Sequence, residues 1–179
     1  MNRIVGIKAP DFNMECVAGN GEEFINVSLD DYRGKWLVLF FYPLDFTFVC
    51  PTEITAISRR IEEFKKAGAD VLGVSIDSKF SHKAWINAPV ENGGLGKINF
   101  PIASDITKEV SQKYGVLIEE AGIALRGLFI IDPDGIVRYS VVHDLNIGRS
   151  VDETLRVLQA LKTGGLCPID WHPGDKLLE

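Results

Sequence analysis

Hydrophobic and polar residues follow different rhythms in different parts of the chain, and each rhythm predicts an element. Near the N-terminus, Phe12, Met14 and Cys16 alternate with polar neighbours, and a glycine-rich turn follows at residues 19–21. A period of two is typical of a half-buried strand, so residues 12–29 are predicted to form a short amphipathic hairpin. The side chain of Cys16 is then expected on the same face as Phe12 and Met14.

The next segments read as a strand, a helix and a second strand. Residues 36–42 are continuously apolar and aromatic, which suits a central strand covered on both faces. Pro51 fits the first helical position, an apolar stripe at helical spacing follows it, and Gly68 ends the helix. Residues 70–76 read as the following strand. This succession predicts a βαβ unit with parallel strands and a right-handed crossover.

The second half of the chain changes the character of the sheet. It first predicts two short helices and one strand, at residues 79–87, 107–114 and 100–103. Residues 126–131 and 136–142 then read as strands joined by Asp-Pro-Asp-Gly, in which proline presets φ and glycine is permissive. Because so short a turn joins them, this pair is expected to be antiparallel. The sheet is therefore predicted to be mixed.

The last helix has clear signals at both ends. It opens with a capping-box pattern at residues 150–153 and stops at the glycine pair 164–165. The following residues, 166–179, include two prolines and are predicted to be an irregular, exposed tail. Without an internal repeat or interdomain linker, the chain reads as one three-layer α/β domain at residues 1–165 followed by this tail.

Composition and charge exclude several classes of protein. The 179 residues are 46% hydrophobic and 25% charged, which is ordinary for a compact globular domain. The net charge is −6, and no quarter of the chain offers the basic face that nucleic-acid binding requires. The longest apolar run, nine residues, is short of the ~20 that a membrane helix needs. The start of the chain has no apolar secretory segment, so we expect a cytosolic location.

The three cysteines, Cys16, Cys50 and Cys167, are too few for a disulfide scaffold. In a reducing cytosol each is an inert core residue, a metal ligand or a reactive thiol. Cys16 lies on the apolar strand face and is interpreted as a packing residue. Cys167 lies near His172, but two potential ligands do not make a metal site, and no metal is expected. The histidines read as solvated or packing residues.

Cys50 occupies the most informative position. It follows a predicted central strand and precedes the first turn of the next helix, a place where open α/β sheets bind ligands. The free N–H groups and positive dipole of a helix start bias a thiol toward the reactive thiolate. Thr47, three residues before Cys50, can donate or accept a hydrogen bond with a substrate that the sulfur attacks. Pro43 can cover one side of the sulfur without offering a competing N–H donor. From position alone, a buried unreactive cysteine remains an equal alternative.

Wider motifs decide between these alternatives. Pro43, Thr47 and Cys50 stand in a Pro-x-x-x-Thr-x-x-Cys pattern followed by Pro-Thr-Glu. Further on, Arg126 begins Arg-Gly-Leu-Phe-Ile-Ile-Asp, and Cys167 stands in Leu-Cys-Pro-x-x-Trp. These motifs resemble those of the typical two-cysteine peroxiredoxins, and the resemblance covers nearly the whole chain. It implies a thioredoxin-like fold and thiol-dependent reduction of hydrogen peroxide and alkyl hydroperoxides, with no bound cofactor.

The resemblance also assigns roles to individual residues. Cys50 is implied to be the peroxidatic cysteine, and Cys167 the resolving cysteine that forms a disulfide with Cys50 of a partner subunit. Thr47 and Arg126 are implied to bind the peroxide, and Pro43 to shield the sulfur.

A supporting pair completes the implied site. Glu53, together with Arg149 in Gly-Arg-Ser-Val-Asp-Glu, is implied to orient the arginines. The implied partners are thioredoxin or a flavoprotein disulfide reductase as electron donor, and a second copy of the chain in a homodimer that can assemble into a decamer. Antioxidant defence is the implied cellular role.

The chemistry makes the arginine roles intelligible but leaves alternatives. Attack of a thiolate on peroxide spreads negative charge along S–O–O, which a multiply donating, always charged arginine stabilises. Without the motif, Arg126 reads as a surface arginine at a strand end. Arg149 sits beside a helix N-terminus, opposes the dipole there, and has Asp152 and Glu153 as alternative partners.

Three other functions compete with peroxide reduction. A disulfide reductase of the thioredoxin kind needs Cys-x-x-Cys, but Thr47 stands where the earlier cysteine would be. A cysteine hydrolase needs a histidine base near Cys50, for which the chain offers His82, His143 and His172. A holdase chaperone or structural ring is the alternative outside the enzymes.

Overall fold

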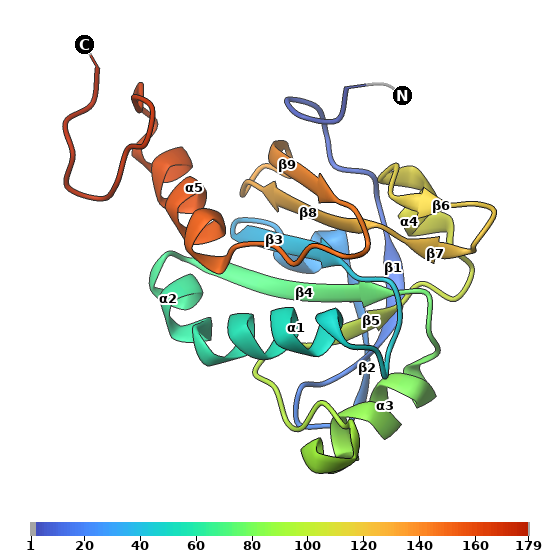
Figure 1. Ribbon diagram of the computed structural model, residues 1–179. Coiled ribbons are helices and arrows are strands. Elements are labelled where there is room, and N and C mark those ends of the chain that lie inside the picture. Colours follow the sequence, from blue (N-terminus) through green and yellow to red (C-terminus); the bar gives the residue numbers. More distant parts are fainter. Residues whose placement is uncertain (1–2, 179) are drawn as a thin grey trace.

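The structure, a computed structural model, describes residues 3–178 and has one mixed seven-stranded sheet at its centre (Figure 1). The strand order is β2-β1-β5-β4-β3-β8-β9, while β6 and β7 form a separate small hairpin. The strands are β1 (Asn13–Val17), β2 (Phe24–Ser28), β3 (Trp36–Phe41), β4 (Ala69–Ser75), β5 (Ile102–Ser104), β6 (Leu117–Ile118), β7 (Ile123–Ala124), β8 (Arg126–Ile131) and β9 (Val137–His143).

Helices lie on both faces of this sheet. They are α1 (Val49–Arg59), α2 (Ile61–Lys66), α3 (Lys79–Asn87), α4 (Glu109–Lys113) and α5 (Val151–Thr163), with short 3-10 turns η1 (Leu29–Tyr32) and η2 (Val90–Asn92). Helices α1, α2 and α5 share one apolar core with the sheet, whereas α4 and η1 belong to the core on the other face. Within residues 3–178, no helix is long and apolar enough to span a membrane.

Strand β3 connects the two cores, because its side chains alternate between them. Val38 and Phe40 face the core that contains α1, and Leu37, Leu39 and Phe41 face the other. All five side chains are completely buried, as expected for a continuously apolar strand covered on both sides. The three-layer α/β prediction is thereby confirmed.

Local pairing follows the sequence pattern closely. Strands β3 and β4 are parallel neighbours, as the βαβ prediction requires, and β1 pairs antiparallel with β2. Strands β8 and β9 form the expected antiparallel hairpin. In its turn, the Gly135 N–H donates to the Asp132 carbonyl at 2.9 Å, and Gly135 has a φ of +79°, which glycine adopts without strain.

The helix predicted from Pro51 differs from the observed one in two ways. It begins at Val49, which places Cys50 inside the first turn, and it breaks at Arg60 into α1 and α2. An early start is possible because proline lacks only an N–H that any first helical turn leaves unpaired. The break coincides with a competing bond, since the side-chain amide of Asn99 donates to the Ser58 carbonyl at 3.1 Å.

The C-terminal part matches the prediction except for the burial of one tail residue. Helix α5 has its Ser150 cap, whose hydroxyl accepts from the Glu153 N–H at 3.2 Å, and it ends at Gly164 in the left-handed region. The tail beyond it is irregular, as predicted. Its expected exposure is wrong for Trp171, which is only 5% exposed.

Candidate active site

Cys50 lies at the second position of α1, beside the carboxyl end of β3, and its side chain is completely buried. The sulfur therefore sits against the free N–H groups and positive dipole end of the helix. Phe48, at the N-cap, is 92% exposed. The site thus combines a fully enclosed sulfur with an exposed aromatic residue two positions before it.

Arg126 brings a fixed positive charge to this sulfur. It is the first residue of β8, and its Nη1 lies 3.4 Å from Cys50 Sγ and 2.7 Å from Glu53 Oε2. Its Nε donates to the Leu145 carbonyl at 2.8 Å, which fixes the plane of the guanidinium. The side chain is only 4% exposed, so the alternative of a surface arginine is wrong. An N–H donor at this distance stabilises negative charge on the sulfur.

Glu53 holds Arg126 and Arg149 together. Its Oε1 accepts from the backbone N–H and the Nε of Arg149, both at 2.8 Å, and its Oε2 accepts from Arg149 Nη2 at 3.0 Å. The other end of Arg149 donates to the carbonyls of Phe41 and Gly127, at 2.8 and 2.6 Å. Arg149 therefore ties α1 to β3 and β8 rather than pairing with Asp152 or Glu153.

The electrostatics of this cluster favour its charged form. Burial alone raises the pKa of Glu53, but hydrogen bonds and charge from Arg149, with the charge of Arg126, outweigh it and bring the pKa below its ordinary value. Burial lowers the pKa of Arg149, and the hydrogen bonds and negative charge of Glu53 offset part of this decrease. One carboxylate serves two guanidinium groups, so the cluster leaves excess positive charge next to Cys50.

Thr47 and Pro43 lie in the loop between β3 and α1. The Thr47 hydroxyl donates to the Leu44 carbonyl at 2.9 Å, which occupies its proton and leaves its oxygen lone pairs free to accept. Among residues 3–178, Thr47 makes no hydrogen bond to Cys50 in this structure. Pro43 is buried, as its predicted shielding role requires.

The other two cysteines have very different surroundings. Cys167 Sγ contacts the Ala160 carbonyl at 3.6 Å and the Thr163 hydroxyl at 3.5 Å, at the end of α5. Figure 1 shows this tail at the opposite side of the molecule from the start of α1, so the fold does not bring Cys167 to Cys50 within one chain. Cys16 is fully buried, and burial, followed by the charge of Glu15, raises its pKa to about 12.

A buried polar network beside the active-site loop was missed by the sequence analysis. His82, read as a solvated or packing histidine, is completely buried on α3, with Nδ1 2.8 Å from Asp45 Oδ2 and Nε2 3.2 Å from the Ala103 carbonyl. Tyr42 donates to the other oxygen of Asp45 at 2.8 Å, and burial with this carboxylate raises the tyrosine pKa well above its ordinary value. The sequence does contain a signal for this burial, because His82 shares a helical face with the apolar Trp85 and Ile86.

This network also bears on the competing hydrolase function. A histidine base must lie within hydrogen-bond reach of its nucleophile. Both ring nitrogens of His82 are engaged by Asp45 and Ala103, and among residues 3–178 no histidine contacts Cys50. The groups that do surround the sulfur are arginines and helix N–H groups, which suit a reaction that builds negative charge.

Comparisons with known proteins agree with this chemistry. The model of the AhpC/TSA family matches residues 5–140. The chain is 69% identical to a putative peroxiredoxin in the rubredoxin operon of Clostridium pasteurianum, over 98% of each chain. It is 57% identical to the chloroplastic 2-Cys peroxiredoxin BAS1 of Hordeum vulgare, over 98% of this chain and 85% of the relative.

Solved structures extend the similarity to three dimensions. The reduced 2-Cys peroxiredoxin of Plasmodium vivax superposes with a TM-score of 0.96 at 42% identity, covering 99% of this chain and 94% of that one. The predicted thioredoxin-like fold is confirmed by this agreement.

Proposed function

Because the chain belongs to the AhpC/TSA family and is a typical 2-Cys peroxiredoxin, a peroxidase, we propose that Cys50 is the cysteine that attacks the peroxide. The observation that carries this assignment is the 3.4 Å contact between Arg126 Nη1 and the buried Cys50 Sγ at a helix start. Within residues 3–178, no cation is hydrogen-bonded to the sulfur of Cys16 or Cys167, and neither cysteine lies at a helix start.

The first step is a displacement at oxygen. The Cys50 thiolate attacks one oxygen of hydrogen peroxide or an alkyl hydroperoxide, an S–O bond forms, and the O–O bond breaks. The leaving hydroxide or alkoxide takes up a proton and departs as water or alcohol. Cys50 is left as a sulfenic acid, oxidised by two electrons, while the peroxide is reduced by the same two electrons.

Arg126 and Thr47 are proposed to hold the peroxide in line. The Arg126 guanidinium donates to the oxygens as negative charge spreads along S–O–O, and Glu53 with Arg149 fixes its position. The Thr47 hydroxyl, whose proton is engaged by Leu44, accepts a hydrogen bond from the O–H of the peroxide. Arg126 already lies 3.4 Å from the sulfur before the reaction, so this group requires little reorganisation.

The second step is proposed to use Cys167 of a partner subunit. Its thiol attacks the sulfenic sulfur, a disulfide forms, and water leaves. Support comes from the separation of the tail and the start of α1 within one chain (Figure 1) and from the position of Cys167 beyond α5, the last helix of the described residues. The protein is accordingly proposed to be at least a homodimer, and decamers are a further state of the family.

The cycle closes when a dithiol protein reduces the disulfide. Thioredoxin and a flavoprotein disulfide reductase are both suited to this exchange, and the proposed role is antioxidant defence. The cytosolic location predicted from the N-terminal sequence stays a prediction.

One experiment tests both sulfur assignments. The protein is treated with one equivalent of hydrogen peroxide, blocked with a thiol reagent, and analysed by non-reducing electrophoresis and mass spectrometry. A dimer joined through Cys50 and Cys167 is expected. In mixtures of Cys50→Ser chains with Cys167→Ser chains, one interchain disulfide per pair is expected, and a disulfide confined to single wild-type chains contradicts the partner assignment. Cys50→Ser alone is expected to abolish turnover with either reductant.

A further inference from the structure

The enclosure of Cys50 sets a condition on the second step of the proposed reaction. Its side chain is completely buried beneath the active-site loop, residues 43–48. A disulfide needs two sulfur atoms only ~2 Å apart, and a buried sulfur offers no such approach to a thiol from outside the chain. The loop therefore has to move before Cys50 is resolved, and whatever holds the loop closed controls that step.

Asp45, in the middle of this loop, is bonded to three other elements. Its Oδ1 accepts from the hydroxyl of Tyr42, just after β3, and its Oδ2 accepts from the hydroxyl of Ser81 on α3, both at 2.8 Å. His82 Nδ1 lies 2.8 Å from the same Oδ2. The backbone N–H of Asp45 donates to Asp77 Oδ2, just after β4, at 2.9 Å. We call these five residues the Asp45 network; its central side chain is only 1% exposed.

The partners of Asp45 are themselves fixed to the sheet. His82 Nε2 lies 3.2 Å from the carbonyl of Ala103 in β5. The hydroxyl of Ser75, the last residue of β4, donates to Asp77 Oδ2 at 2.7 Å. The partners therefore stay in place when the loop moves, because their other bonds go to strands. The bonds at Asp45 itself are the ones that must break when the loop opens.

The residue that follows Asp45 is strained. Phe46 has a φ of +55°, in the left-handed region that residues other than glycine enter at a cost in free energy. Its ring packs against Trp85 of α3, with centroids 5.9 Å apart. A strained backbone persists only where its surroundings impose it. The closed loop therefore depends on the bonds of Asp45 and on this ring contact, and opening relieves the strain.

We propose that Asp45 is a positioning residue whose carboxylate holds the active-site loop closed against α3. While its bonds are intact, Cys50 stays buried beside Arg126 for the peroxide step. When they break, the oxidised sulfur is exposed to the thiol of a partner subunit. The proposal rests on the roles proposed above for Cys50 and Cys167, and it names the group that sets how often the loop opens.

Weakening the Asp45 network affects the two steps unequally. Loss of one buried hydrogen bond to a carboxylate changes an equilibrium about tenfold. The closed form predominates, so a tenfold increase in opening leaves the closed population, and with it the rate of the peroxide step, almost unchanged. Disulfide formation passes through the open form, so its rate rises in proportion to the opening equilibrium.

Hydrogen exchange of the reduced, full-length protein, followed by mass spectrometry, tests the network directly. Tyr42→Phe removes one donor to Asp45 and keeps the ring, and Ser81→Ala removes another donor. Each variant is expected to exchange the backbone N–H groups of residues 44–50 about tenfold faster, with no change in β8. Ser81→Thr keeps a hydroxyl at this position and is expected to exchange at the wild-type rate.

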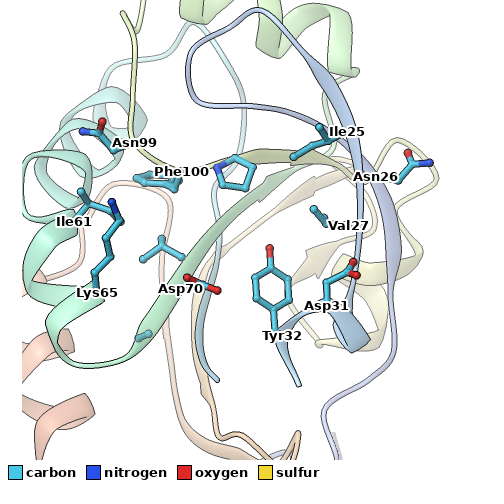
Figure 2. A pocket seen from close by; sticks show the side chains of 13 residues that line it. Ile25, Asn26, Val27, Asp31, Tyr32, Ile61, Lys65, Asp70, Asn99 and Phe100 are labelled. Carbon is cyan, nitrogen blue, oxygen red and sulfur yellow. The ribbon is translucent and has the colours of Figure 1, made fainter. Parts of the chain in front are cut away.

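Two control variants separate an effect on the loop from a general loss of stability. Tyr114→Phe removes another buried tyrosine hydroxyl, which donates to the Pro10 carbonyl at 2.9 Å in the core on the other face of the sheet. Ser28→Ala removes a hydroxyl that donates to Asp31 Oδ2 at 2.9 Å, at the hollow shown in Figure 2. Both lose one hydrogen bond away from the loop, so exchange in residues 44–50 should stay within about twofold of the wild type.

Rapid-mixing kinetics then connect the network to the reaction. Tyr42→Phe and Ser81→Ala are expected to form the disulfide between Cys50 and Cys167 about tenfold faster than the wild type. Sulfenic acid formation should stay within about twofold of the wild-type rate. A purely structural role would lower the denaturation midpoint without producing this split between the two steps.

Different results would overturn different parts of the proposal. Equal exchange in Tyr42→Phe and Tyr114→Phe would exclude the Asp45 network as the group that holds the loop, whatever the chemistry of Cys50. Faster exchange with an unchanged disulfide rate would remove its link to the second step. A change of oligomer size confined to the network variants, seen by size-exclusion chromatography, would mean that the network acts on assembly instead. If wild-type protein forms no disulfide between Cys50 and Cys167, the proposed function fails, and the exchange measurement still decides the role of Asp45.

Discussion

Cys50 and Cys167 are the same chemical group in opposite surroundings. Cys50 is completely buried, with Arg126 Nη1 3.4 Å away and a further arginine fixed by Glu53 behind it. Cys167 is partly exposed, and within residues 3–178 its sulfur is hydrogen-bonded to a carbonyl at 3.6 Å and a hydroxyl at 3.5 Å and to no charged group. Under the roles proposed for the two cysteines, this difference means that reactivity toward peroxide is built by fixed charges, whereas resolution depends on a segment that can leave its place.

The largest effect is expected from removing the fixed charge at Cys50. Arg126→Ala should slow the peroxide step by about 10² to 10³, the usual cost of one donor aimed at developing charge. The rate of Arg126→Lys should lie between those of the wild type and Arg126→Ala. Lysine keeps the charge but loses the Nε bond to Leu145 and the planar shape of the guanidinium. Stopped-flow measurement of sulfenic acid formation checks this, with exposed Arg138→Ala as the control. Equal rates for Arg126→Ala and the control would remove Arg126 from the mechanism.

The next effect concerns the carboxylate that unites the two arginines. Glu53→Gln leaves Arg126 and Arg149 buried without their counter-charge, so the free energy of unfolding at neutral pH should fall by about 3 kcal/mol. Denaturant unfolding measures this. The equivalent change at an exposed pair, Glu62→Gln beside Lys65, should cost less than about 1 kcal/mol.

The pH dependence of the same variant sharpens the test. The folded pKa of Glu53 lies below its ordinary value of 4.5, so its contribution to stability is present above that pH and is lost as the pH falls through the folded pKa. Wild-type protein should therefore lose more stability on acidification than Glu53→Gln. Parallel acid unfolding curves for the two proteins would contradict the assignment.

The tail is expected to respond to smaller changes, because few contacts hold it. The backbone carbonyl of Trp171 accepts from Arg156 Nη1 at 3.0 Å, and the indole N–H of Trp171 donates to the Asp175 carbonyl at 3.1 Å. Trp171→Ala should lower the free energy of tail opening by ~1.4 kcal/mol and raise the alkylation rate of Cys167 about tenfold. Mass spectrometry after timed alkylation measures the rate.

Two controls separate this tail effect from general damage. Trp171→Phe keeps ring packing but loses the indole donor, so its alkylation rate should lie between those of the wild type and Trp171→Ala. The peroxide step at Cys50 should stay within twofold of the wild type in both variants. If Cys50 slows as much as Cys167 accelerates, the two regions are coupled and the contrast between them fails.

The same contrast explains what the sequence could predict. The elements β3, α3 and β8 follow from local pattern, because periodicity and caps act over a few residues. The break at Arg60 and the burial of Trp171 were not predictable locally, since they depend on Asn99 and Arg156 from other segments. The residues of the candidate site were identified by motif, but the four hydrogen bonds of the Arg149 side chain form only where α1, β3 and β8 meet.

Cys16 provides the smallest expected effect and completes the comparison of the three thiols. It is as buried as Cys50, but it lies in strand β1, and within residues 3–178 no cation is bonded to its sulfur. Its pKa is raised to about 12, so at pH 8 only about one molecule in ten thousand carries the thiolate. Burial without fixed positive charge should therefore suppress reactivity. In native protein, iodoacetamide should label Cys167 and leave Cys16 unlabelled until the protein unfolds. Cys16→Ala should keep turnover within twofold of the wild type and cost about 1 kcal/mol of stability. Labelling of native Cys16 as fast as Cys167 would show that burial does not suppress its reactivity. The difference between Cys16 and Cys50 could then no longer be attributed to the arginines at Cys50.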